Sequence, residues 1–113
     1  TAVRLHTYLP QTVLGARETA RSIEDAIRQK LAGCATSLRV DLDGIRSMAP
    51  SFFDELIRII EESVIAEGRT VPDITIANPH RRLSPAFQAV CRAHMLEISE
   101  STEGDWLITR AHQ

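Results

Sequence analysis

Apolar and polar residues change their period along the first part of the chain, and the change separates strands from a helix. Residues 2 to 9, "AVRLHTYL", alternate loosely and predict a first strand. From Ala16, apolar residues recur at helical spacing as far as Leu31, and Gly33 is expected to end this helix. Residues 37 to 42, "SLRVDL", alternate again and predict a second strand.

The next helix, over residues 52 to 66, has the strongest pattern in the chain. Ser51 is expected to cap its N-terminus, with Asp54 answering three residues later as a variant capping box. Gly68 is expected to close it. One stripe of apolar residues points to the core, and it consists of Phe53, Leu56, Ile57, Ile60 and Val64.

The second half of the chain continues the alternation of strands and helices. Residues 73 to 77, "DITIA", predict a third strand, and "NPHRRL" at 78 to 83 predicts a turn. Ser84 followed by Pro85 is typical of a helix start, and this helix is expected to reach about His94.

Two final strands complete the pattern, "LEIS" at 96 to 99 and "DWLIT" at 105 to 109, joined by the hairpin turn "ESTEG". The order β-α-β-α-β-α-β-β predicts an α/β fold with a mixed sheet of four or five strands. Right-handed crossovers would place the helices mainly on one face of that sheet. We expect a single domain over residues 1–113.

Composition narrows the class of function. The 113 residues are 43% hydrophobic and 25% charged with a net charge of −2, which argues against a general nucleic-acid or acidic-membrane binder. Cys34 and Cys91 lie far apart, so neither a zinc site nor a disulfide framework is indicated. We expect reduced thiols and a cytoplasmic protein without a membrane-spanning helix or signal peptide.

Titratable residues do not form a metal or cofactor motif. The four histidines are scattered without the i, i+4 spacing of a helical metal site. Asp41 and Asp43 end a predicted strand, where an α/β sheet often binds its ligand, but a third acidic ligand and a phosphate-binding loop are not evident nearby. We expect turn residues there, with no metal and no cofactor.

Ser47 and Ser51 flank the tripeptide Met-Ala-Pro just before the helix. A hydroxyl at a helix N-terminus faces free N–H groups and the positive end of the dipole, which favours a phosphate. The simpler role of Ser51 is the N-cap. Because no GxSxG motif and no matched base is present, an enzyme is not expected.

His80, Arg81 and Arg82 form the only basic cluster of the sequence. They could bind an anion or an acidic partner, although solvated turn residues are the simpler interpretation, and no aromatic residues are interleaved for base stacking. A small anion- or nucleotide-binding module is therefore the alternative function.

Three apolar residues of the 52–66 helix lie off its main stripe, namely Phe52, Ile59 and Ile65. Either a neighbouring element covers them or they form an exposed patch for a protein partner, and the pattern alone leaves both interpretations open.

"RVDLDGIRSMAPSFFDEL" at 39–56 resembles the STAS domains of bacterial anti-sigma-factor antagonists, in which a strand ends in a similar tract before a helix. The likeness is closer to bacterial STAS-like domains of unassigned function, whose two tracts are similar to "GARETA" at 15–20 and "PSFFDEL" at 50–56. It covers about residues 2 to 98. At the position of the family's regulatory phosphoserine this chain has Pro50, so a switch would have to use Ser47 or Ser51.

The resemblance implies a non-catalytic regulatory domain that binds a protein. The partner would be a histidine-kinase-like ATPase, an anti-sigma factor or a domain of the same polypeptide. The residues expected to carry the contact or the switch are Ser47, Ser51, Phe52, Asp54 and Glu55. A homodimer is left open.

Overall fold

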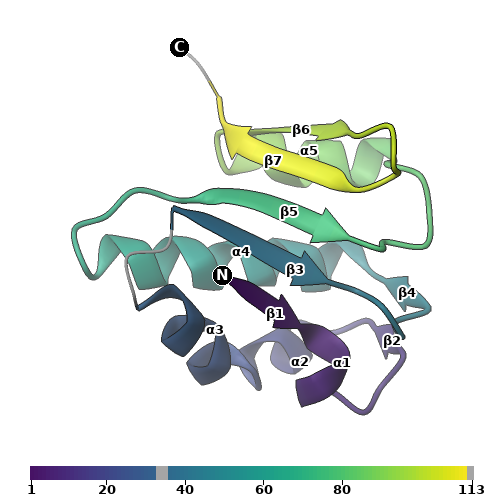
Figure 1. Ribbon diagram of the computed structural model, residues 1–113, viewed down its shortest axis with the longest axis horizontal. Helices are drawn as coiled ribbons and strands as arrows, with labels where there is room; N and C mark the ends of the chain where they lie inside the picture. Colours follow the sequence, from purple (N-terminus) through teal and green to yellow (C-terminus); the bar gives the residue numbers. More distant parts are fainter. Residues whose placement is uncertain (33–35, 112–113) are drawn as a thin grey trace.

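The computed structural model describes residues 1–32 and 36–111, which form an α/β domain (Figure 1). The strands are β1 (Ala2–Arg4), β2 (Val13–Leu14), β3 (Ser37–Asp41), β4 (Ser47–Met48), β5 (Asp73–Ala77), β6 (Leu96–Glu100) and β7 (Trp106–Arg110). The helices are α1 (Leu5–Tyr8), α2 (Arg17–Arg21), α3 (Glu24–Leu31), α4 (Pro50–Ile65) and α5 (Pro85–Ala93).

The main sheet has five strands in the order β1-β3-β5-β7-β6. The strands β1, β3 and β5 are parallel, with Val3 opposite Val40 and Val40 opposite Ile76. β7 runs antiparallel to β5, and β6 runs antiparallel to β7 as the second arm of a hairpin. The mixed α/β sheet predicted from the order of elements is therefore confirmed.

One face of this sheet is buried and the other is open. Burial alternates along the strands as the pleat requires; in β3, Leu38 and Val40 are buried and Arg39 is exposed. Helices α4 and α5 lie behind the sheet in Figure 1, and α4 also packs against α2 and α3. The helices thus cover one face, as predicted, and polar side chains occupy much of the other.

The segment predicted as one strand over residues 2 to 9 is a three-residue strand followed by the helical turn α1. Leu5 and Leu9 are both buried, and the N–H of Leu9 donates to the carbonyl of Leu5 at 2.9 Å. An i, i+4 pair of buried leucines follows the helical period, whereas the strand prediction rested on a loose alternation.

The predicted helix from Ala16 to Leu31 is interrupted at residues 22 and 23. The Ser22 hydroxyl donates to the Thr19 carbonyl at 2.6 Å, and Ile23 leaves helical geometry with φ −110° and ψ 14°. This local side-chain bond competes with the helical ladder and divides the segment into α2 and α3. Gly33, expected to end the helix, lies outside the described residues.

Helix α4 starts differently from the prediction. Its N-cap position is Ala49 and Pro50 occupies the first turn, so Ser51 is already inside the helix and does not cap it. Proline is favoured there because its missing N–H would have no helical partner. At the other end Gly68, with φ +69°, follows the last turn as predicted. Ser84 occupies the N-cap position of α5 without a side-chain capping bond.

The three off-stripe residues of α4 separate into two groups. Phe52 and Ile59 are completely buried, while Ile65 is 68% exposed. The prediction of Phe52 as a partner contact is therefore wrong, because helices on both flanks of α4 widen its buried face beyond a single stripe. Next to Phe52 in sequence, Phe53 packs edge-on against Phe87 and Trp106, at centroid distances of 5.3 and 6.2 Å.

No helix among residues 1–32 and 36–111 combines the length and apolar character needed to cross a membrane.

Replacing Phe52 by Ala should lower the free energy of unfolding by about 3–5 kcal/mol, because a fully buried ring would leave a cavity. Ile65→Ala on the same helix is the matched control and should change it by no more than about 0.5 kcal/mol. Urea unfolding followed by circular dichroism measures both. Equal effects of the two substitutions would contradict the burial of Phe52.

Candidate functional site

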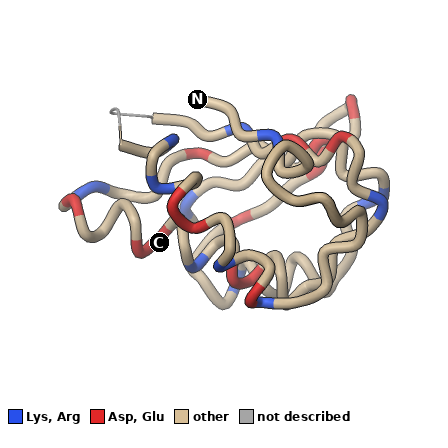
Figure 2. The backbone as a smooth tube through the Cα atoms, turned by 90° about the horizontal axis from the view of Figure 1, so that it is seen from below, with Lys and Arg blue, Asp and Glu red and all other residues tan. Residues whose placement is uncertain are grey.

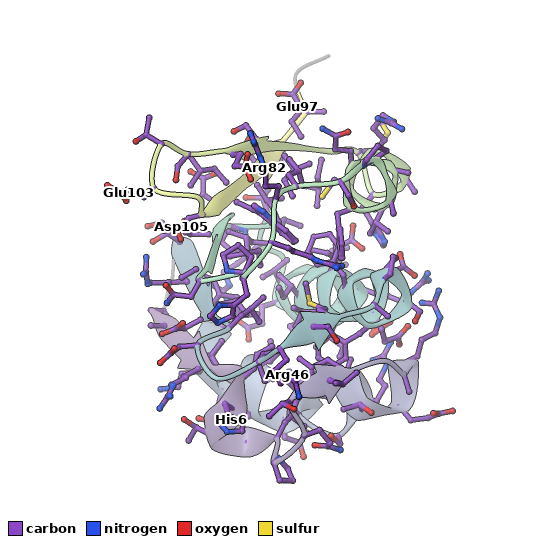
Figure 3. The ribbon with its side chains drawn as sticks, turned by 90° about the vertical axis from the view of Figure 1, so that its right-hand side faces the viewer. His6, Arg46, Arg82, Glu97, Glu103 and Asp105 are labelled. Carbon is purple, nitrogen blue, oxygen red and sulfur yellow. The ribbon has the colours of Figure 1, made fainter. Side chains whose placement is uncertain are left out.

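The loop between β3 and α4 lies at the end of the molecule where the parallel strands terminate. Figure 3 looks onto this end, with His6 and Arg46 labelled near one another. Asp43, Gly44, Arg46 and Pro50 are exposed, whereas Ile45 and Met48 are buried. The loop therefore presents polar side chains on a backbone anchored by two apolar residues.

The short ribbon β2–β4 fixes the second half of this loop. Val13 pairs with Ser47 and Leu14 with Met48 in parallel register. Two N–H groups, of Arg46 and Ser47, donate to the Thr12 carbonyl at 2.7 and 3.2 Å. Sequence periodicity could not reveal strands of two residues, so the ribbon was missed.

Ser47 and Ser51 are partly buried in this anchoring. The Ser51 hydroxyl donates to the Gly15 carbonyl at 3.2 Å and so ties the first turn of α4 to the segment before α2. A phosphate on Ser51 would remove this donor and place its negative charge beside a carbonyl oxygen. The structure gives Ser51 a positioning role in place of the predicted N-cap.

The first half of the loop lies against α1 at Gly44. This residue has φ +90°, and a Cβ built on it would lie 2.8 Å from Cδ2 of His6. Both the backbone conformation and the close approach therefore require glycine.

Asp41 and Asp43 connect the ends of three strands. Asp41 Oδ1 accepts from Asn78 Nδ2 at 2.8 Å and from the N–H of Asp43 at 2.9 Å, and Arg4 pairs with Asp43 at 3.2 Å. Burial raises the pKa of Asp41, but these hydrogen bonds outweigh it and the net pKa is lowered. The described residues contain no group of three His, Cys, Asp or Glu side chains placed to hold a metal ion.

A second polar cluster joins the helices on the outer side of α4. We call it the helix clamp, and it consists of Arg17, Arg21, Asp54, Glu55, Arg58, Glu61 and His94. It brings together Asp54 and Glu55, two of the predicted site residues, with partners on other helices that lie between 34 and 40 positions away along the chain.

Asp54 is the acceptor at the centre of the clamp. Its Oδ2 accepts from Arg17 at 2.5 Å and from Arg58 at 3.4 Å, and its Oδ1 lies 2.5 Å from His94 Nε2. Burial raises the pKa of Asp54, but the hydrogen bonds from Arg17, His94 and Arg58 more than offset it and hold the pKa at about 2. The carboxylate is therefore ionised over the physiological range.

His94 bridges two carboxylates at the C-terminal end of α5. Its Nδ1 lies 2.6 Å from Glu61 Oε1, opposite the contact with Asp54. Ionised carboxylates only accept, so both contacts are hydrogen bonds when each ring nitrogen carries a proton. In the sequence the four histidines look scattered, because the partners of His94 lie on a different helix.

Glu55 belongs to the α2 side of the clamp. It accepts from Arg21 Nε at 2.5 Å and from Arg17 at 3.2 Å. Arg21 also bonds Glu62 and Glu24, each at 2.9 Å, and these acceptors raise the pKa of its guanidinium. Of the clamp residues, Arg17, Asp54 and Glu55 lie in the two tracts that carry the family resemblance. The acids and bases of the clamp are hydrogen-bonded to one another across different helices, so the clamp joins these helices. Each clamp carboxylate already has a partner within the clamp.

His80, Arg81 and Arg82 lie away from the clamp, on the loop between β5 and α5, and all three are exposed. With residues 100–105 this loop lines an open cavity of about 450 Å³. The same cavity contains Glu100, Glu103 and Asp105, and Arg82 pairs with Glu100 at 3.6 Å. Acidic groups thus offset the positive charge, and along the backbone the two signs are intermixed (Figure 2).

Cys91, the one cysteine among the described residues, is buried. Burial raises the pKa of Cys91 to about 12, so this side chain is a core residue and not a nucleophile. Cys34 lies outside the described residues.

Comparisons with protein-family models, with curated proteins and with solved structures give no match for this chain.

The clamp should make stability depend on acid. The folded-state pKa of Asp54 is lowered to about 2 from an ordinary 3.8, so the folded state binds fewer protons; its contribution is present above about pH 4 and is lost as pH falls toward 2. Between about pH 5 and pH 2 the wild type should lose about 2 kcal/mol more than Asp54→Asn. Urea unfolding across this range measures the difference. Asp25→Asn, at an exposed position of α3, is the control, and its free energy of unfolding should change with pH as that of the wild type does. Parallel profiles for wild type and Asp54→Asn would refute the role of Asp54.

The loop conformation can be tested at Gly44. Gly44→Ala and Gly104→Ala both introduce a side chain at a φ near +90°, but at Gly104 the new methyl meets nothing within 4 Å. Gly44→Ala should therefore lower the free energy of unfolding by about 1–3 kcal/mol more than Gly104→Ala. Thermal and urea unfolding provide the comparison, and equal losses would mean that α1 does not confine the loop.

Proposed function

We propose that this chain is a non-catalytic regulatory domain that binds a protein partner through the end of the molecule carrying the β3–α4 loop. The contact surface, called the loop surface, consists of Val13, Asp43, Gly44, Arg46 and Pro50. One observation carries the proposal: Val13 is 59% exposed on a ribbon whose backbone is hydrogen-bonded in place, beside an exposed arginine. A rigid backbone that presents an apolar and a charged side chain loses little entropy when it binds.

The chemistry of the serines supports a binding role over an enzymatic one. Ser51 donates to a backbone carbonyl, and no described histidine or carboxylate is hydrogen-bonded to either serine. A serine nucleophile needs such a base together with a donor for the oxyanion. The acids and bases that do come together, in the helix clamp, are paired with one another.

Two predicted contact residues take a different part in this proposal. The side chains of Asp54 and Glu55 are only 15% and 11% exposed and are held by arginines, so they position their partners and do not meet a ligand directly. Arg17 and Arg58, each with 50% of the side chain exposed, are the charged groups that they hold at the surface. These two arginines, one on α2 and one on α4, lie outside the loop surface and would favour a partner that carries acidic groups.

The class of partner follows from the resemblance to STAS-like domains. A histidine-kinase-like ATPase or an anti-sigma factor would dock on the loop surface, and modification of Ser47 or Ser51 would disturb the hydrogen bonds that set its shape. Pro50 at the family's phosphoserine position makes a constitutive contact the simpler form of this function.

The alternative, a nucleotide or other small anion bound near His80, Arg81 and Arg82, is opposed by the three acidic residues in the same cavity. A ligand that binds only the folded state raises the melting temperature, so thermal shift with nucleotides separates the two functions.

Arg46→Glu and Val13→Asp should each weaken binding to a purified histidine-kinase-like ATPase or anti-sigma factor from the same host by about tenfold or more. Both side chains are exposed, so the melting temperature should change little. Lys30→Glu, an exposed charge reversal on α3, is the control that keeps full affinity. Isothermal titration calorimetry gives the dissociation constants. Unchanged affinity in both loop variants would remove the loop surface from the contact, and a nucleotide-induced thermal shift without protein binding would favour the alternative.

A further inference from the structure

The sheet ends at β6 with an edge that no other described strand pairs with. In Figure 1 this strand forms the outer border of the sheet, and α5 lies behind it. An edge strand presents unpaired N–H and C=O groups and can accept a further strand. The edge at β1 is only three residues long, so β6 with its five residues is the better template.

The hydrogen bonds to β7 show which backbone groups of β6 point outward. At its two ends, Ala111 N–H donates to the Met95 carbonyl at 3.1 Å, and Ser101 N–H donates to the Asp105 carbonyl at 2.8 Å. Because bonding alternates along an antiparallel pair, the odd-numbered residues Glu97 and Ser99 also face β7. The N–H and C=O groups of the even-numbered residues, Leu96, Ile98 and Glu100, therefore face away from the sheet.

A groove runs along this edge with a volume of about 530 Å³. Its lining comes from both sides of β6. On the helix side are Leu96 and Ile98 together with Gln88 and Arg92 of α5. On the open side are Glu97, Ser99, Leu107 and Thr109. An added strand would find a surface for its side chains on each face, as alternation along a strand requires.

We propose that the occupant of this edge is β6 of a second copy of the chain, running antiparallel about a two-fold axis at Ile98. Such a pair joins the two five-stranded sheets into one. Ile98 faces Ile98 of the second copy, and Leu96 faces Glu100 of the second copy, so all outward backbone groups of β6 are paired. No other register about a two-fold axis overlaps all five residues of the strand.

Charge complementarity supports this register. Glu97 lies opposite Ser99 of the second copy, where a hydroxyl can donate to the carboxylate, and no two like charges are directly opposed. Shifting the axis to Glu97 would place the two Glu97 carboxylates face to face. On the helix side, Arg92 is exposed next to Leu96, and it forms no ion pair with the described residues. Glu100 of the second copy, whose carboxylate accepts from the Leu83 N–H and pairs with Arg82 within its own chain, would approach this arginine as a further partner.

The dimer leaves the loop surface free. Figure 3 places Glu97 at one extreme of the molecule, with His6 and Arg46 near the other. Dimerisation through β6 and docking through the β3–α4 loop are therefore separate events, and each can fail without the other.

Charge variants at the pair formed by Glu97 and Ser99 test both the dimer and its register. Sedimentation velocity over a wide range of concentrations should show a reversible dimer for the 113-residue chain. Ser99→Glu creates two like-charge contacts and should raise the dissociation constant by about tenfold, whereas Ser99→Lys should lower it. The double variant Glu97→Lys, Ser99→Glu restores opposite charges across the axis and should restore the wild-type dissociation constant.

Ser37→Glu adds the same charge at an exposed position of β3 on the open face and should leave the dimer unchanged. Arg46→Glu should also leave it unchanged, which keeps this test apart from the test of the loop surface. Circular dichroism and melting temperature establish that each variant is folded. A monomer at every concentration would overturn the proposal, and so would a dimer that is indifferent to Ser99→Glu or is not restored by the double variant.

Discussion

The burial of α4 is the constraint on which the rest of the structure depends. Nine of its 16 residues are buried, and the helix packs against α2, α3 and α5 as well as covering the sheet. A surface helix typically has one narrow stripe of apolar residues. A helix enclosed on several sides needs a wider apolar surface that includes both flanks of that stripe. Phe52 and Ile59 belong to that apolar surface. The polar side of α4 carries Asp54, Glu55, Arg58 and Glu61 of the helix clamp.

We expect the clamp to fix the arrangement of the helices more than to add net stability. The carboxylates of Asp54 and Glu55 are nearly buried, and desolvation offsets much of the attraction between paired charges. Loss of one partner is costly nevertheless, because a carboxylate would remain without its donors. Arg17 ties α2 to the first turns of α4, and His94 ties the end of α5 to Asp54 and Glu61. Relative movement of these helices would therefore break charged hydrogen bonds. Because the loop before α4 leads directly into this helix, the same bonds also restrain the loop.

Much of the fold could be predicted from local sequence. The strands β3 and β5, the hairpin β6–β7 and the helix α4 all have the period and length that local patterns detect, and the α/β class followed from their order. Local patterns failed where a few residues decide the structure. Leu5 and Leu9 fit either period, Ser22 breaks a helix with one side-chain bond, and the ribbon β2–β4 is too short to have a period.

The candidate site was less predictable, for a reason that lies in three-dimensional contacts. A serine followed three residues later by an acid looks like a capping box, but the helix starts at Pro50, two residues before the predicted start, and the Ser51 hydroxyl bonds the Gly15 carbonyl instead. Whether Phe52 is exposed depends on which helices flank α4, and the partners of Asp54 lie on α2 and α5. None of these facts has a signature within one segment. They appear only when residues almost 40 positions apart meet.

The carboxyl ends of the parallel strands and the edge strand β6 can therefore contact another molecule in different ways. At the carboxyl ends of β1, β3 and β5, the hydrogen bond between Asp41 and Asn78 and the pairing of β2 with β4 already hold the backbone, so side chains would make most of the contacts with another molecule. At β6 no strand of the described residues pairs with the outer side of the backbone, and a strand with a compatible pattern can extend the ladder there. Side-chain recognition discriminates between partners, while strand addition depends mainly on main-chain geometry. A copy of the same strand meets that second requirement without a separate partner, because one short segment, Leu96–Glu100, supplies both sides of the pairing.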